Sequence, residues 1–277
     1  MERKTARLFT TALALITALQ ISYATHATAL TNKLPEKFEA HYTLQVYGIT
    51  LAEATHSLKH TDNGLSMAVN TRPVGLLAFL YDGHIDIRSD IALDNGQLLL
   101  VNHDYTHSDD AEHSTVRYEI TRAKSDEKKT AEVVTGTYKG ETVTINSDQP
   151  VWDPLSIQAI IIINADKETT SYEHGLLMKG ELKHYIFENH GKETIGFNGS
   201  KVTALKTAVK EADRDRIIYV WMLPEYHNIP VKYEHWKEGD LKSTLLLQNV
   251  TFENEGKTTS LAISHTSEED KNDFEDW

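Results

Sequence analysis

Apolar and polar residues alternate along most of this chain. In residues 38–46, Phe38, Ala40 and Tyr42 fall on one side of an extended chain, and the residues between them are polar or charged. A period of two residues is the pattern of a β-strand with one buried face. The pattern recurs at residues 51–61, 64–71, 84–93, 97–107, 114–124, 131–136, 141–146, 181–189, 192–197, 201–212, 216–223, 231–239 and 241–253. With turn signals between them, these segments predict about a dozen antiparallel strands.

One segment, residues 152–166, breaks the alternation. Asp153 is a good N-cap, and Pro154 suits the first helical position, where its missing N–H costs nothing. The polar residues inside the segment are Ser156, Gln158 and Asn164. A helix over 153–165 is therefore apolar on nearly all sides and must be enclosed on nearly all sides. A buried strand is the alternative, because isoleucine favours β-structure.

These patterns together predict a mainly β protein. We expect an antiparallel curved sheet, forming a half-open or closed barrel of about a dozen strands that wraps the apolar helix at 153–165. The sequence shows no repeat of fixed period and no Pro/Ser-rich linker. We therefore expect one β-rich domain over residues 30–265. Residues 266–277 are acidic and without periodicity, which predicts a disordered tail.

The first residues have the pattern of a secretory signal. Basic residues at positions 3–7 precede an apolar stretch at 8–21, and small residues at 27–29 supply a cleavage pattern. We expect residues 1–29 to be a signal peptide cleaved near Ala29. The mature chain is then a soluble periplasmic protein that does not span the membrane, because no later segment is long and apolar enough to do so.

Charge and cysteine content narrow the choice of partners. The chain carries a formal net charge of −13 and no cysteine. Nucleic acids and anionic membrane surfaces require clustered Lys and Arg, so this acidic chain is a poor candidate for either. Without disulfides, its stability must come from burial.

Histidine-rich segments raise the question of a metal site. His56 and His60, and likewise His103 and His107, are spaced for zinc binding on a helix. On a strand that spacing spans about 13 Å, so two rings cannot reach one ion. The segment 107–113, His-Ser-Asp-Asp-Ala-Glu-His, lacks the ligand order of a calcium loop and is better explained as an acidic hairpin tip. We therefore predict no metal and no cofactor, and the absence of nucleophile-elbow and zincin motifs leaves no residue assigned as catalytic.

Aromatic residues gather in the predicted strands at 216–223 and 231–239. Both faces of the first strand are apolar, which places it centrally against the helix. In the second, Lys232 and Glu234 share a face with Trp236 and could orient a ligand, although a core tryptophan beside an ion pair explains the same pattern. The predicted ligand-binding residues are Trp152, Ile157, Ile161, Trp221, Glu234 and Trp236.

Several short motifs occur in a fixed order along the chain. They are FEAHYTLQVYGITLA from Phe38, DPLS at the start of the predicted helix, and WMLPE, IPVKYE and EGDL near the end. In this order they resemble a bacterial exported family, domain of unknown function 3108, over residues 38–250. The resemblance implies an exported β-rich domain with a curved sheet and no assigned activity. It supplies no catalytic residues.

Three hypotheses about function follow. The first is a non-enzymatic periplasmic protein that binds or carries an apolar or amphiphilic ligand, with a cavity of several hundred Å³ beside the helix; envelope carriers of lipids and lipoproteins have a similar layout. The second is an envelope protein–protein interaction module that uses a sheet edge or the acidic tail. The third is an unrecognised hydrolase, which requires carboxylates and histidines to converge in one cleft.

Overall fold

The computed structural model describes residues 33–94, 96–108, 114–124, 130–167 and 171–263. The expected signal peptide and the expected acidic tail lie outside the described residues. Both stay predictions, as do the domain boundaries.

The described strands form one sheet that is antiparallel except where β9 pairs with β10. The first series of strands is β1 (Lys37–Val46), β2 (Ile49–Thr61), β3 (Gly64–Pro73), β4 (His84–Asp94), β5 (Gln97–Ser108), β6 (Ser114–Lys124), β7 (Thr130–Tyr138) and β8 (Glu141–Ser147). The second series is β9 (Val151–Trp152), β10 (Ser171–Met178), β11 (Glu181–Phe197), β12 (Ser200–Glu211), β13 (Arg216–Leu223), β14 (Ile229–Lys237), β15 (Asp240–Asn254) and β16 (Lys257–Ala262).

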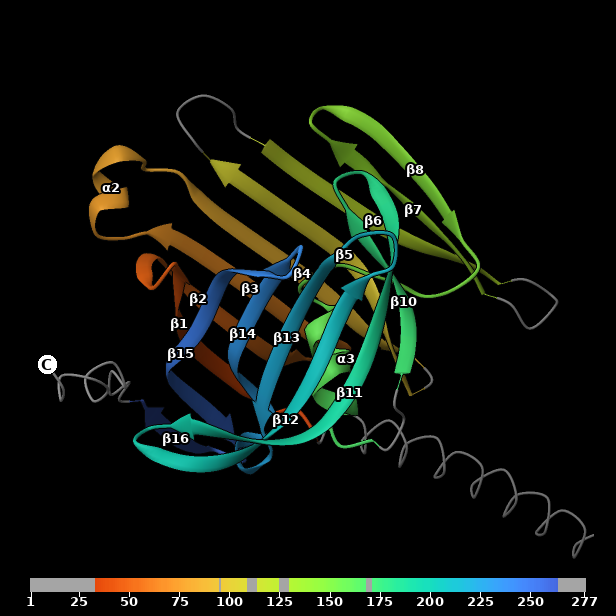
Figure 1. Cartoon of the computed structure of the whole chain (residues 1–277). Helices are drawn as coiled ribbons and strands as arrows, with labels where there is room; N and C mark the ends of the chain where they lie inside the picture. The colour runs from red at the N-terminus through yellow and green to blue at the C-terminus, as the bar shows by residue number, and fades with distance from the viewer. Residues whose placement is uncertain (1–32, 95, 109–113, 125–129, 168–170, 264–277) are drawn as a thin grey trace, which may run out of the picture.

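The sheet order places the two ends of the described chain side by side. The order is β8-β7-β6-β5-β4-β3-β2-β1-β15-β14-β13-β12-β11-β10-β9, and β16 pairs with β15. The central ladder joins β1 to β15, with Phe38 opposite Phe252 and Tyr42 opposite Leu247. The two series curve into opposite walls of a nearly closed barrel, with helix α3 between them (Figure 1). The predicted fold class is confirmed.

The strands follow the predicted alternation, with differences at a few places. Residues 181–197 form one strand rather than two, because a bulge between Asn189 and Gly191 interrupts the period of two without ending the strand. The alternation did not reveal β9, β10 and β16. Strand β9 has two residues, and β16 is mostly exposed, so neither carries a clear two-residue pattern.

Helix α3 (Ile157–Asn164) is the predicted apolar helix rather than a strand. It is shorter than the expected 153–165, since regular helical structure begins after a turn at residues 154–156. Its buried residues are Ile157, Ala159, Ile161, Ile162 and Ile163. Complete burial of an isoleucine side chain contributes about 1.5–3 kcal/mol, so this helix is a substantial part of the core.

The two ends of the barrel differ. Because β1 is antiparallel to both β2 and β15, the β1–β2 and β14–β15 turns lie at the same end, which we call the rim. At the opposite end, the base, Asn228 donates a hydrogen bond to the Ile162 carbonyl at 3.2 Å, and Lys33 donates one to the Ile163 carbonyl at 3.1 Å. A short 3₁₀ helix, η1 (Pro224–Tyr226), also lies at the base. The C-terminal end of α3 is thus fixed at the base.

Helix α2 (Leu76–Leu80) connects β3 to β4 at the rim and has no buried residue. Leu76, Phe79 and Leu80 are 78%, 87% and 79% exposed. Figure 1 shows α2 projecting beyond the ends of the strands. Within the part of the chain that the structure describes, no helix is long and apolar enough to cross a membrane.

Candidate functional site

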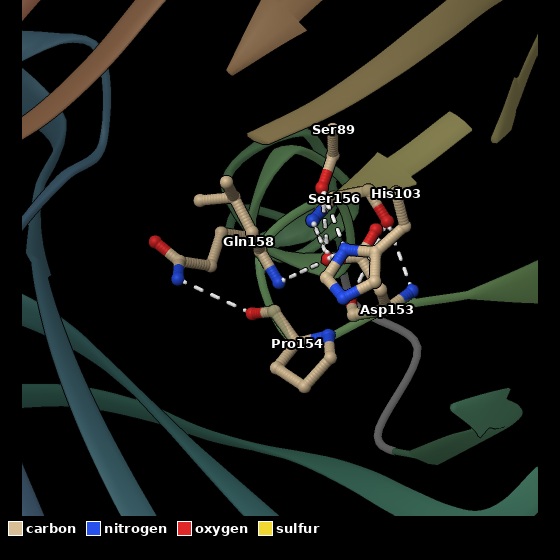
Figure 2. A network of polar contacts seen from close by, with 7 residues as sticks. Ser89, His103, Asp153, Pro154, Ser156 and Gln158 are labelled. Atoms are coloured by element: carbon tan, nitrogen blue, oxygen red, sulfur yellow. Dashed lines mark hydrogen bonds and ion pairs between the residues drawn. The ribbon is translucent and has the colours of Figure 1, made fainter. Parts of the chain in front are cut away.

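The turn that leads into α3, residues 154–156, is held by a reciprocal pair of side chains. Asp153 Oδ1 accepts the N–H groups of Leu155 and Ser156 at 2.8 and 3.2 Å, and Ser156 Oγ accepts the Asp153 N–H at 3.0 Å. This is the arrangement of a capping box, in which Ser156 takes the place of the usual Glu or Gln three residues after the capping residue. Asp153 therefore holds the turn that leads into the helix (Figure 2), whereas the N-cap of α3 itself is Ser156 rather than the predicted Asp153.

Two residues of the opposite wall meet the same carboxylate. Ser89 donates a hydrogen bond to Asp153 Oδ1 at 3.0 Å, and His103 Nδ1 lies 3.2 Å from this oxygen (Figure 2). A nucleophile–base relay needs the serine hydroxyl on one ring nitrogen and the carboxylate on the other. Here Ser89 Oγ lies 3.3 Å from Nδ1, the nitrogen that also faces Asp153. The cluster lacks the geometry of such a relay, and it ties α3 to β4 and β5.

The environment of Asp153 favours its charged form. Burial alone raises its pKa, but the hydrogen bond and electrostatic attraction from His103, together with the donors of Ser156 and Leu155, outweigh burial and lower the pKa below its ordinary value. Asp153 is therefore a carboxylate at neutral pH.

A cavity of about 280 Å³, the apolar cavity, lies between α3 and the second wall. Its lining contains no Asp, Glu, Lys or Arg. Apolar side chains from the helix and from four strands make up much of it: Leu44, Ile157, Ile161, Val209, Val220 and Leu245. A concave, mostly apolar surface of this kind suits a small apolar ligand.

Several polar side chains interrupt this apolar lining, among them His56, Gln158 and Tyr233. Tyr233 donates a hydrogen bond to Gln158 Oε1 at 3.2 Å, and the His56 ring lies against Tyr42 with centroids 4.7 Å apart. Burial lowers the pKa of His56 to about 4, against an opposing hydrogen bond from Gln158. His56 is thus neutral at pH 7. Polar groups placed in this way can orient a ligand without adding charge.

A second cavity, of about 460 Å³, lies where the β10–β11 hairpin meets β6 and β7; we call it the seam cavity. Here Gly180 N–H donates to the Tyr118 hydroxyl at 2.7 Å, and Leu177 packs in one cluster with Tyr118 and Val134. Pro154 and Met178 line both cavities. The two cavities are therefore adjacent, separated by these two side chains.

The structure distributes the predicted ligand-binding residues over different places. Ile157 and Ile161 line the apolar cavity, as expected of a site beside the helix. Trp152 is 3% exposed, lies beside His174 with ring centroids 6.2 Å apart, and is not part of either lining. Its indole N–H has no hydrogen-bond partner among the described residues.

Trp221 lies on the outer face of the second wall, because its neighbour Val220 faces the apolar cavity. The ammonium groups of Lys206 and Lys232 lie 4.6 and 4.4 Å from the Trp221 ring centroid, and its N–H donates to Glu193 at 3.1 Å. Two lysine ammonium groups thus lie over a large aromatic ring on the outside of the barrel.

Glu234 and Trp236 lie on the same outer face. Glu234 accepts a hydrogen bond from Trp236 Nε1 at 2.9 Å and pairs with Lys232 at 2.5 Å. The structure shows the ion pair that the sequence offered as the alternative to a ligand site. Of the predicted residues, Ile157 and Ile161 line the apolar cavity, and the other four line neither the apolar cavity nor the seam cavity.

Sequence reasoning missed His56, Gln158 and Tyr233 as residues of the cavity. A signal existed for one of them. His56 occupies an inward position of β2, in line with the buried residues Ala54 and Leu58. A histidine at an apolar position of an alternating strand indicates a buried polar group with a partner.

The histidine pairs lie on strands, His56 and His60 on β2 and His103 and His107 on β5, where residues four apart are about 13 Å apart. His107 Nε2 lies 2.6 Å from the Tyr81 hydroxyl. In the described parts of the chain, no group of three His, Asp or Glu residues is placed to hold a metal. Residues 109–113 of the acidic hairpin tip lie outside the described residues.

Comparisons with known proteins agree with this architecture. No curated protein matches the chain. A β-barrel-like protein of domain of unknown function 1849 from Brucella abortus is similar in structure, with a TM-score of 0.51, 9% identity, and coverage of 79% of this chain and 99% of that one. A protein with a YmcC-like fold from Bacteroides fragilis aligns with a TM-score of 0.27, 9% identity, and coverage of 78% and 95%. The first similarity supports the barrel-like fold alone.

The model of the family described as "Protein of unknown function (DUF3108)" matches residues 37–245. This range includes all of β1, helix α3 and the lining residues of both cavities. The chain therefore belongs to the DUF3108 family.

Proposed function

We propose that this chain is a non-enzymatic binding or carrier protein for an apolar or amphiphilic ligand. The observation that carries the proposal is the uncharged, mostly apolar cavity beside Ile157 and Ile161. Burial of each methylene group contributes about 0.8 kcal/mol, so a short hydrocarbon chain in this cavity provides measurable affinity. The groups of His56, Gln158 and Tyr233 fix its orientation.

Mass spectrometry of organic extracts from the purified full chain tests this proposal. We expect a co-purifying amphiphile, or uptake of Nile red by protein from which lipid has been removed. Ile161→Phe fills part of the apolar cavity and lowers uptake several-fold. Ile49→Phe is the matched control, because Ile49 is 65% exposed and lines neither cavity. An unchanged uptake by the folded Ile161→Phe variant, or no uptake by the wild type, contradicts the proposal.

We also propose that the protein acts in the cell envelope, after export and cleavage near Ala29. The basic, apolar and small-residue pattern of the first residues supports this. The mass of the protein recovered from periplasmic extract gives the mature N-terminus. Recovery of the intact chain in the cytoplasm contradicts export.

Exposed strands favour an envelope interaction module as the second candidate function. Strand β8 ends the sheet order, and all of its residues are exposed or half-buried. An edge of this kind can pair with an extended segment of a partner. Thr144→Pro within β8 should abolish capture of an envelope partner and leave ligand uptake intact. Capture that survives this change contradicts the edge mechanism.

A further inference from the structure

Several hairpins of the sheet share one turn geometry. Their turns are X–Gly pairs in which both residues have positive φ: Tyr47–Gly48, Lys139–Gly140, Lys179–Gly180, Asn198–Gly199, Glu238–Gly239 and Glu255–Gly256. This backbone favours Asn or Asp at the first position and has no preference for lysine. The choice of side chain there must come from what surrounds it.

The two turns with lysine are the ones at the seam cavity. Lys139 and Lys179 line that cavity, with φ values of 52° and 53°. The first residues of the other four turns line neither cavity. The backbone conformation is the same in all six turns, so it does not explain why two of them have lysine. What distinguishes these two turns is their position at the seam cavity.

The two lysine hairpins converge at the seam. Gly180, next to Lys179, lies so close to the Tyr138 ring that a Cβ there would be 3.2 Å from it. The Lys139 ammonium lies 5.9 Å from the centroid of the same ring. Both cations therefore border one opening.

These lysines have no acidic partner among the described residues. The lining of the seam cavity contains no carboxylate, and neither lysine forms an ion pair within the described ranges. Glu141 and Glu181, which follow the two turns, line neither cavity. In a chain with a net charge of −13, two cations at one opening, without a carboxylate partner in the described ranges, form a local site for an anion.

We propose that Lys139 and Lys179 hold the anionic headgroup, a carboxylate or a phosphate, of an amphiphile whose chain passes Pro154 and Met178 into the apolar cavity. This inference rests on the proposed function and names the class of ligand. The seam cavity is the polar end of the site, with tyrosine hydroxyls beside the lysines, and the uncharged apolar cavity is its hydrocarbon end. Lysine serves as a point charge for either kind of headgroup.

Calorimetric titration of the delipidated full chain tests the inference with matched probes. Decanoate and decanol share a hydrocarbon chain and differ in charge, whereas acetate and inorganic phosphate carry charge without a long chain. We expect decanoate to bind at least about tenfold more tightly than decanol, the effect of two partly exposed ion pairs. Acetate and phosphate should bind too weakly to measure.

The double variant Lys139→Gln/Lys179→Gln should lose about tenfold in decanoate affinity and keep its decanol affinity. Lys201→Gln/Lys257→Gln is the control, because it removes the same charge from exposed residues after X–Gly turns at the base. This control should bind decanoate as the wild type does. Thermal unfolding of each variant verifies that it is folded.

The outcomes separate this inference from the proposed function. Wild-type protein that binds neither decanoate nor decanol overturns both. Decanol binding with no preference for decanoate, or equal losses in the two double variants, overturns the headgroup site alone. Lysine-dependent binding of acetate or phosphate at the affinity of decanoate shows a small-anion site and also overturns it.

Discussion

Two short apolar helices of this molecule differ in burial. Helix α3 has the sequence IQAIIIIN and is mostly buried between the walls, whereas α2 has the sequence LLAFL and no buried residue. Composition does not separate them. The difference lies in the residues that lead into each helix. Asp153 binds the turn before α3 and contacts Ser89 and His103 on two strands of the opposite wall, whereas Gly75, the N-cap of α2, has no side chain to form such contacts.

A polar residue near the start of an apolar helix thus determines where that helix packs. The apolar face of α3 provides the free energy of burial, and the carboxylate of Asp153 gives that face a fixed position against Ser89 and His103. The following predictions test this contrast, in order of decreasing effect.

Asp153→Ala should cause the largest loss, about 4 kcal/mol in the free energy of unfolding, because it removes the carboxylate that holds the turn before α3 and leaves buried donors without a partner. Urea unfolding followed by circular dichroism measures the loss. Asp153→Asn keeps an acceptor for the N–H groups and should lose less. A loss for Asp153→Ala within about 0.5 kcal/mol of zero would show that α3 is held by its apolar face alone.

Ile163→Ala should lose about 3 kcal/mol, because Ile163 is 2% exposed and its removal leaves a cavity in the core. The same urea experiment measures it. Leu80→Ala in α2 is the control, since Leu80 is 79% exposed. Equal losses in the two variants would contradict the contrast between the helices.

The pH dependence of stability should report on His56 beside α3. Its pKa in the folded protein, about 4, lies below the ordinary 6.5, so the unfolded chain takes up a proton first as the pH falls. The contribution is full above about pH 6.5, decreases by up to about 3 kcal/mol as the pH falls to 4, and then levels off.

His56→Gln removes this titration and keeps a polar group beside Gln158. Burial also lowers the pKa values of His60 and His174, so wild type and variant should both lose stability as the pH falls. The difference between their urea midpoints from pH 7 to pH 4 isolates His56. Parallel pH curves for the two proteins would show that His56 is not buried as a neutral group.

Phe79→Ser should have the smallest effect, within about 0.5 kcal/mol, because the Phe79 side chain is 87% exposed. Thermal unfolding measures it. A loss above about 2 kcal/mol would mean that α2 is packed in the folded state, and the contrast with α3 would then fail.

Much of the fold could be predicted from local patterns, since a strand with one buried face and a helix with an Asp-Pro start each carry their signal within a few residues. The residues that line the site could not be predicted in the same way. Strand β13 is apolar on both faces, so the sequence does not show that Val220 faces inward and Trp221 outward. That assignment depends on which face of the sheet curves around α3.

The lysine turns illustrate the same limit. Lys139 and Lys179 lie in ordinary hairpin sequences, and their meeting depends on how the two ends of the sheet approach each other. A sequence reading can identify each turn, but the seam is a property of the closed sheet. His56 could be predicted in part. The alternation of its strand shows that it points inward, but the sequence does not show that Gln158 is its partner.

The ladder between β1 and β15 has a consequence for the order of assembly. Every other ladder between long strands joins strands that are neighbours in sequence. The β1–β15 ladder instead pairs Phe38 with Phe252, so it can form only after nearly the whole chain has been synthesised. Closing so long a loop carries an entropic cost and slows folding. We therefore expect each wall to form first from its local hairpins. The β1–β15 ladder, at the middle of the finished sheet, should form last.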